Sequence, residues 1–190
     1  MISRPPQAGF RLRHAARLIH RGGVVAYPTE GVYGLGCDPL NPDAVARVLA
    51  IKGRSKAKGL ILIGANYAQL APYVAPLRGD RLARVLASWP GPVTWLLPAR
   101  PGVPPWLRGN HATVALRVTA HPLAAALCHA VGHPLVSTSA NRSGQRPLRT
   151  PLGVQRVLGK NLDCLLHGPL GGQRGPTEIR DGLTGGVLRR

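Results

Sequence analysis

Short apolar runs alternate with helix-start signals along this chain, and this alternation limits the folds open to it more than any other feature. Runs of four or five residues rich in Val, Leu and Ile are too short for helices and match buried strands in length and composition. The strands predicted in this way are 24–27, 60–63, 93–97, 114–118 and 135–138, and short strands at 162–166, 177–180 and 187–189 would complete the sheet.

Capping residues mark the helix boundaries between these runs. Asn41-Pro42 places a capping side chain before a proline at the first helical position, and Thr150-Pro151 repeats this pattern. Gly22-Gly23 ends an earlier helical stretch. The predicted helices are 11–20, 42–52, 80–89, 122–130 and one that begins at 150–151.

Strands and helices that interleave in this way predict an α/β (α+β) fold built on one mixed sheet. Several strands are joined by short connections, which favours antiparallel neighbours. The chain of 190 residues suits a single domain, residues 1–190, better than two. Aromatic residues make up only 4% of the chain against 44% hydrophobic residues in all, so the core is expected to be aliphatic.

The charge of the chain points to anionic partners. Lys and Arg number 25 against seven Asp and Glu, a formal net charge of +18. Such a surface attracts polyanions, either nucleotide phosphates, RNA or both. No apolar run has the length of a signal sequence or a membrane span, and the three cysteines are too far apart to predict a disulfide framework. A cytoplasmic location is therefore expected.

Two segments at predicted strand ends have compositions typical of ligand sites. Tyr27–Gly36 contains three glycines, which allow close backbone approach and positive φ, together with polar side chains; an ordinary turn has the same composition. Lys52–Gly59 holds three lysines and Arg54, and such a cluster needs either solvent or a bound anion to offset its self-repulsion. The second segment is interpreted as a solvated loop or as a clamp for a triphosphate.

Arg117 and a run of hydroxyls complete the candidate chemistry. Arg117 interrupts an apolar strand, so it is expected to be paired, ligand-bound or on an exposed face. Because acids are scarce, a ligand carboxylate is a reasonable partner. The segment 137–144 places hydroxyls and an amide after a buried strand, a set that suits phosphate oxygens and ribose hydroxyls. The histidines show no paired metal spacing, and no metal site is predicted.

These segments, taken together and in order, resemble the YrdC-like threonylcarbamoyl-AMP synthase family in its short bacterial TsaC form. The resemblance covers nearly the whole chain and rests on its combination of motifs. The matching residues are Ala26–Glu30, Tyr33–Cys37, the pair Lys52-x-Arg54 with Ser139-x-Asn141, Trp89–Thr94, Ala115–Val118 and Thr177–Asp181.

The resemblance implies a twisted mixed sheet flanked by helices with a basic concave face. It implies that L-threonine, bicarbonate and ATP condense to L-threonylcarbamoyladenylate and pyrophosphate. Other threonylcarbamoylation proteins would then transfer the product to an adenosine beside the anticodon of tRNA. Mg²⁺ is expected to arrive with ATP rather than in a dedicated protein site.

The resemblance also implies roles for particular residues. Lys52 and Arg54 would act in catalysis by neutralising phosphate charge. The residues implied in ATP binding are Lys52, Arg54, Lys58, Thr113, Ser139, Asn141 and Arg189. The residues implied around threonine are Thr29, Arg117, Ser137 and Thr177, with Arg117 on its carboxylate.

Two other functions fit parts of the sequence. A non-catalytic module that binds double-stranded RNA or tRNA would account for the +18 charge, although few aromatics are present for base stacking. A domain that transfers a carbamoyl group to another amine would share the fold. The enzyme hypothesis requires the KxR and SxN groups to meet in one cavity, whereas an RNA-binding module requires only a basic stripe.

Overall fold

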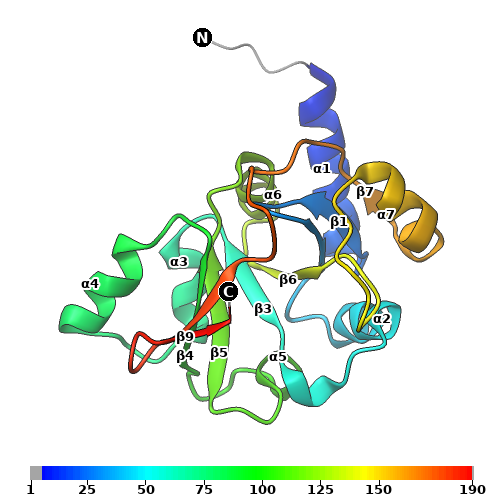
Figure 1. Ribbon diagram of the computed structural model, residues 1–190. Helices are drawn as coiled ribbons and strands as arrows, with labels where there is room; N and C mark the ends of the chain where they lie inside the picture. Colours follow the sequence, from blue (N-terminus) through cyan, green and yellow to red (C-terminus); the bar gives the residue numbers. More distant parts are fainter. Residues whose placement is uncertain (1–5, 190) are drawn as a thin grey trace.

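One nine-stranded mixed sheet organises the computed structural model, which describes residues 6–189 (Figure 1). The strand order is β7-β1-β2-β6-β3-β5-β4-β8-β9. The strands are β1 Val25–Pro28, β2 Tyr33–Gly36, β3 Ile61–Gly64, β4 Val93–Pro98, β5 Thr113–Val118, β6 Leu135–Ser139, β7 Cys164–Leu165, β8 Glu178–Asp181 and β9 Val187–Arg189. The predicted α/β class with a mixed sheet is confirmed.

Antiparallel neighbours dominate the sheet, as the short connections predict. The pairs β1–β2, β2–β6, β3–β6, β4–β5 and β8–β9 are antiparallel, and β1–β7, β3–β5 and β4–β8 are parallel. The parallel pairs bring together segments that are far apart in the chain. In particular, β8 lies beside β4 and carries residues near the C-terminus to the middle of the molecule (Figure 1).

Seven α-helices are present among residues 6–189. They are α1 Pro6–His20, α2 Pro42–Lys52, α3 Tyr67–Leu70, α4 Gly79–Ala87, α5 Pro105–Arg108, α6 Pro122–Val131 and α7 Pro151–Leu158. Within the described part of the chain, none of them has both the length and the apolar character that crossing a bilayer requires.

The predicted caps form as expected. The Asn41 side chain accepts a hydrogen bond from Ala44 N (3.0 Å) and Thr150 caps α7 through Gly153 N (3.1 Å). The prediction of one domain over 1–190 stays a prediction, and its ends, residues 1–5 and 190, lie outside the described residues.

The helices cover the two faces of the sheet unequally. On one face, α1 and α6 pack on Val25, Tyr27, Ile63 and Leu135, and they leave part of that face uncovered. On the opposite face, α2, α3 and α4 enclose the largest apolar cluster, which includes Leu62, Trp95 and Leu116, and α7 packs beside it on β1 and β2. As expected from the composition, aliphatic side chains make up most of these clusters. The uncovered part of the first face is where a ligand can reach the strands.

The sequence did not predict β2, because glycine is normally unfavourable in strands. Here the ring of Tyr27 on β1 crosses the neighbouring strand, and a Cβ on Gly36 would lie 2.7 Å from that ring. The close approach predicted for this glycine-rich segment is therefore confirmed. The predicted positive φ is wrong, since Gly31, Gly34 and Gly36 are not among the residues with positive φ.

Candidate active site

A cavity of about 370 Å³ lies on the uncovered part of the sheet face. The strand register shows that its floor lies on that face, because paired residues of neighbouring strands point to the same side of a sheet. Ile61 pairs with both Ser137 and Ala115. Two residues along the same strand, Ile63 pairs with Arg117 and packs against α1 and α6. The walls come from the turn after β1, the loop after α2, the end of α5 and the last strand, β9. The cavity therefore collects residues from almost the full length of the chain.

Sequence-predicted site residues line this cavity, with the exceptions of Lys52 and Asn141. Those present are Thr29, Arg54, Lys58, Thr113, Arg117, Ser137, Ser139, Thr177 and Arg189. The convergence that the enzyme hypothesis requires is thus found for Arg54 and Ser139. The individual contacts to substrates stay predictions.

The charge lining the cavity has one sign. Five cationic side chains and no Asp or Glu are among its lining residues: Arg54, Lys58, Arg108, Arg117 and Arg189. Desolvation lowers the pKa of Arg54. Desolvation, followed by the charges of Arg54 and Arg117, lowers the pKa of Arg189. Cations that repel one another in a partly dry cavity are stabilised by a bound anion.

Arg117 is buried at one end of the cavity and is already paired. Its Nη2 lies 3.3 Å from Glu30 Oε2, and both side chains are 5% exposed. Its Nη1 donates to Thr177 Oγ1 at 2.6 Å. The sequence-based reason for assigning a ligand carboxylate, the scarcity of acids, is therefore wrong, because Glu30 supplies one. Nevertheless Arg117 lines the cavity, and its buried Nε has no partner.

Glu30 is held in place from its other side. Its Oε1 accepts hydrogen bonds from Thr119 Oγ1 (2.7 Å) and from Ala120 N (3.1 Å). These contacts fix the carboxylate on the end of β5, where it orients the guanidinium of Arg117. The sequence marked Glu30 only as a polar residue near a strand end, because its partners lie 89 and 90 residues away in the chain.

Arg54 lies in the loop that follows α2 and lines the cavity. Its Nη2 donates to Gly59 O at 3.1 Å, and its buried Nε has no partner. Ser55 caps the short 3₁₀ helix Lys56–Lys58 that carries Lys58 to the cavity. Gly59 has φ +62°, which proline cannot adopt, so this loop depends on glycine at the position after Lys58.

Lys52 and Asn141, which the resemblance assigns to ATP binding, are not among the residues that line the cavity and lie behind its wall. Lys52 is 3% exposed and its Nζ donates to Ser139 O (2.5 Å), Asn141 O (3.0 Å) and Asn141 Oδ1 (3.2 Å). Desolvation, with a smaller effect from Arg54, lowers the pKa of Lys52 to about 8. Their substrate contacts stay predictions that this arrangement does not favour.

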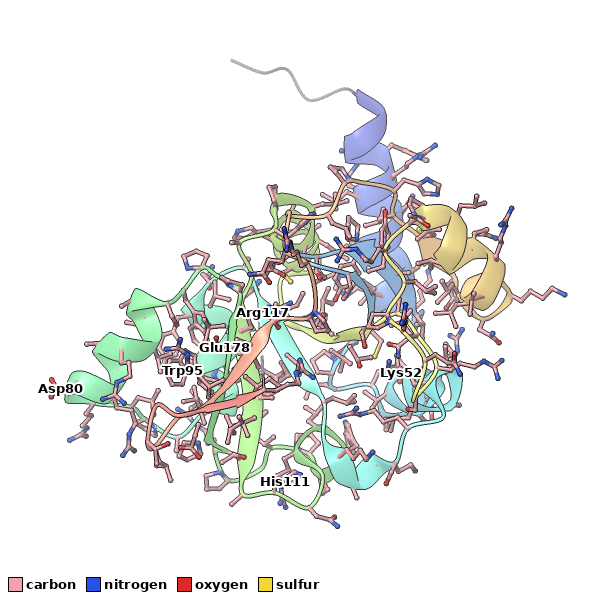
Figure 2. All side chains as sticks on the ribbon, viewed as in Figure 1. Lys52, Asp80, Trp95, His111, Arg117 and Glu178 are labelled. Carbon is pink, nitrogen blue, oxygen red and sulfur yellow. The ribbon has the colours of Figure 1, made fainter. Side chains whose placement is uncertain are left out.

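Arg108 and His111 line the cavity although the sequence did not indicate them. His111 lies just before the start of β5, whereas Arg117 lies toward the other end of this strand (Figure 2). Apolar residues, including Leu96, Leu107 and Leu188, complete the lining. Nothing in the local sequence marks these residues, because only packing of α5 and β9 brings them to the cavity.

An α/β sheet whose open face carries a cation-lined cavity with hydroxyl and apolar walls defines a protein that binds anionic small molecules such as nucleotides. Comparison with known proteins makes the class more specific. Residues 17–190 match the Sua5/YciO/YrdC family model, described as telomere recombination. The chain belongs to this family, which confirms the resemblance predicted from its motifs.

Individual relatives agree with this assignment. A protein of Nitrosococcus oceani named threonylcarbamoyl-AMP synthase is 59% identical over 95% of this chain and 97% of its own length. The structure of Escherichia coli YciO superposes with a TM-score of 0.85 at 29% identity, over 98% of this chain and 91% of that chain. That of P. abyssi Sua5 complexed with L-threonine gives a TM-score of 0.85 at 32% identity, over 90% of this chain and 51% of that chain.

Proposed function

We propose that this chain is a threonylcarbamoyl-AMP synthase, which condenses L-threonine, bicarbonate and ATP to L-threonylcarbamoyladenylate and pyrophosphate. The observation that carries the proposal is the cavity itself, in which five cations and no acid meet hydroxyls from β5, β6 and the 177 region. The Nitrosococcus oceani relative, which is 59% identical to this chain, is named threonylcarbamoyl-AMP synthase, and this supports the same activity.

The reaction brings together groups that repel one another. The neutral amine of threonine reacts with bicarbonate, or its CO₂ equivalent, to give a carbamate and water. The carbamate oxygen then attacks the α-phosphorus of ATP, and the bond to pyrophosphate breaks. Both reactants are anions, so fixed cations lower the barrier by offsetting their repulsion and by stabilising charge on the leaving group. Holding the substrates in one cavity supplies the rest.

The two ends of the cavity divide the substrates. Arg117, with Thr29, Ser137 and Thr177, would hold threonine through its carboxylate and polar groups. Arg54, Lys58 and Arg189 are the proposed phosphate ligands, and the geometry adds Arg108 as a further cation beside them. Ser139 and Thr113 also line the cavity and are assigned to the nucleotide. Because the guanidinium of Arg117 is fixed by Glu30 and Thr177 before substrate arrives, it needs no reorganisation on binding.

Magnesium is proposed to enter with ATP. Within the described residues 6–189, no group of three His, Cys, Asp or Glu side chains is placed to hold a metal ion. Glu30 is paired with Arg117, and Glu178 is paired with Arg180. The protein thus offers phosphate ligands rather than metal ligands, and the MgATP complex is the proposed substrate form.

The product is proposed to serve tRNA threonylcarbamoyladenosine formation in the cytoplasm, after transfer to other threonylcarbamoylation proteins. Because the adenylate is an activated mixed anhydride, a transferring partner must take it up before water does. The formal charge of +18 favours a second role for the surface, contact with tRNA or double-stranded RNA. This binding would accompany the enzymatic activity and would weaken steeply with added salt.

The test is incubation of the purified chain with MgATP, ¹³C-bicarbonate and each amino acid in turn, followed by mass spectrometry. We expect an adenylate that carries one ¹³C atom and forms with threonine, together with threonine-dependent release of pyrophosphate. An adenylate that forms with a different amino acid instead would indicate that the substrate is another amine. RNA binding without any adenylate would favour the non-catalytic module.

A further inference from the structure

The side chain of Lys52 has no hydrogen-bonding capacity left for a ligand. An ammonium group has three N–H donors, and here they meet Ser139 O, Asn141 O and Asn141 Oδ1 at 2.5–3.2 Å. The side chain is buried at the C-terminal end of α2 and is absent from the cavity lining. A phosphate could reach this ammonium only by displacing a contact that is already made.

Asn141 is saturated in the same way. Its Oδ1 accepts from Ser139 Oγ (2.6 Å) and from Lys52 Nζ (3.2 Å). Its Nδ2 donates to Arg142 O (2.8 Å) and to Gln145 O (2.7 Å). An amide side chain has two acceptor positions and two N–H donors, and all four are used inside the protein. Asn141 is 8% exposed and does not line the cavity either.

Ser139 is the member of this group that reaches the cavity. It is joined to Lys52 through its backbone carbonyl and to Asn141 through its hydroxyl. A further bond, from Ser143 N to Lys52 O at 2.7 Å, fastens the end of α2 to the same loop. The contacts therefore connect a helix end to the segment that follows β6, and they converge on the one residue with access to ligand.

We infer that Lys52 and Asn141 are positioning residues that hold Ser139 and the loop 139–145 against the cavity, and that they do not bind ATP themselves. This inference rests on the proposed function for its kinetic consequences. It also explains the pairing of the Lys52-x-Arg54 and Ser139-x-Asn141 motifs: one residue of each motif faces the cavity, and the other joins the two motifs beneath it.

Substitutions Lys52→Met and Asn141→Ala test the inference, with Lys160→Met as a matched control that removes an exposed lysine outside the cavity lining. Loss of charge-assisted hydrogen bonds predicts a rise of about tenfold or more in the KM for ATP. The KM for threonine should change less than about twofold, because Ser137 is held by the β6–β3 pairing and not by Lys52. A purely structural role would lower kcat and leave both KM values unchanged.

The double variant separates positioning from direct binding. If Lys52 and Asn141 act through one network, Lys52→Met in the Asn141→Ala background adds less than about twofold to the loss in kcat/KM for ATP. If each residue contacts ATP independently, the two losses multiply, and that result would overturn the inference.

Amide hydrogen exchange without substrates gives a readout that does not depend on activity. We expect the amides of Ala140, Asn141 and Ser143 to exchange about tenfold faster in Lys52→Met and Asn141→Ala than in the wild type, and to be unchanged in Lys160→Met. Unchanged protection in all variants would refute the network. Faster exchange in a protein that makes no adenylate would retain the network and reject the proposed function.

Discussion

The two ends of the cavity hold their cations in opposite ways. At the inner end, Arg117 is 4% exposed and is bonded to Glu30 and Thr177. At the outer end, Arg54, Lys58 and Arg108 line the cavity with no acid among the lining residues, and Arg189 reaches toward the inner end, where its Nη2 donates to Thr177 O at 3.1 Å. The inner cation is neutralised and fixed by the protein, whereas the outer cations repel one another and remain partly exposed to water.

This difference indicates two kinds of recognition. A fixed and partly neutralised guanidinium suits a small zwitterion such as threonine. One further carboxylate can accept the remaining hydrogen bonds of this guanidinium, and the net charge of the group stays small. A cluster of unpaired cations suits a polyanion such as a triphosphate, whose charge relieves their repulsion. Binding at the inner end should therefore be most sensitive to substitutions that move the guanidinium of Arg117. Binding at the outer end should be most sensitive to substitutions that remove a positive charge.

The largest combined effect on stability and threonine binding is expected for Arg117→Ala. It removes the proposed carboxylate ligand and leaves the buried Glu30 charge without its partner, a change that costs about 3–5 kcal/mol of stability. We expect a lower urea midpoint and a KM for threonine raised by about 100-fold or more, well beyond any change in the KM for ATP. Equal changes in both KM values would contradict the division of the cavity.

Arg54→Ala should abolish measurable threonine-dependent pyrophosphate release while the protein remains folded. The guanidinium donates only to two backbone carbonyls of its own loop, Gly59 O at 3.1 Å and Lys58 O at 3.5 Å, so its loss should change the free energy of unfolding by about 1 kcal/mol. Steady-state kinetics and urea unfolding of the same sample provide the check. Normal turnover would remove Arg54 from the phosphate clamp.

Glu30→Gln keeps the shape of the side chain and an oxygen that can accept from Thr119 and Ala120, but it removes the charge beside Arg117. We expect about a tenfold rise in the KM for threonine, with the KM for ATP within twofold of the wild type. A variant whose KM for ATP rises instead would show that the inner pair serves the nucleotide.

Ionic strength should distinguish the two ends without any substitution. Raising salt from about 0.01 M to 0.1 M shortens the Debye length from about 30 Å to about 10 Å, and exposed charges are screened more than buried ones. The KM for ATP is expected to rise several-fold, and the KM for threonine is expected to change less. Parallel changes measured by the pyrophosphate assay would argue against a buried, paired Arg117 as the threonine ligand.

The smallest effect is a pH-dependent contribution of Lys52 to stability. Its folded pKa of about 8 lies below the ordinary lysine value of 10.5, so burial of the ammonium opposes folding below pH 8. Between these two values the unfolded chain binds more protons than the folded chain, and stability from this group rises with pH. Urea unfolding at pH 7.5 and 9.5 provides the check. The free energy of unfolding of the wild type, relative to that of Lys52→Met, should be higher at pH 9.5 than at pH 7.5. A gain at the lower pH would contradict the assigned direction.

Local signals in the sequence were sufficient for most elements. The caps at Asn41 and Thr150 and the aliphatic runs predicted helices and strands within a few residues of those observed, because capping and burial patterns act over short stretches of chain. The main failure was β2, where the glycines that argued against a strand make room for the ring of Tyr27.

By itself, the sequence determined the fold class, the family and the collection of cations and hydroxyls that a nucleotide-binding cavity would require. Only the tertiary structure decided which of them face the cavity: it paired Arg117 with Glu30, placed Lys52 and Asn141 beneath the wall, and brought Arg108 and His111 onto it. The physical reason is distance along the chain. Residue type and local pattern set which groups are available, but the exposure and partners of a side chain depend on strands and loops that meet only after the sheet has formed.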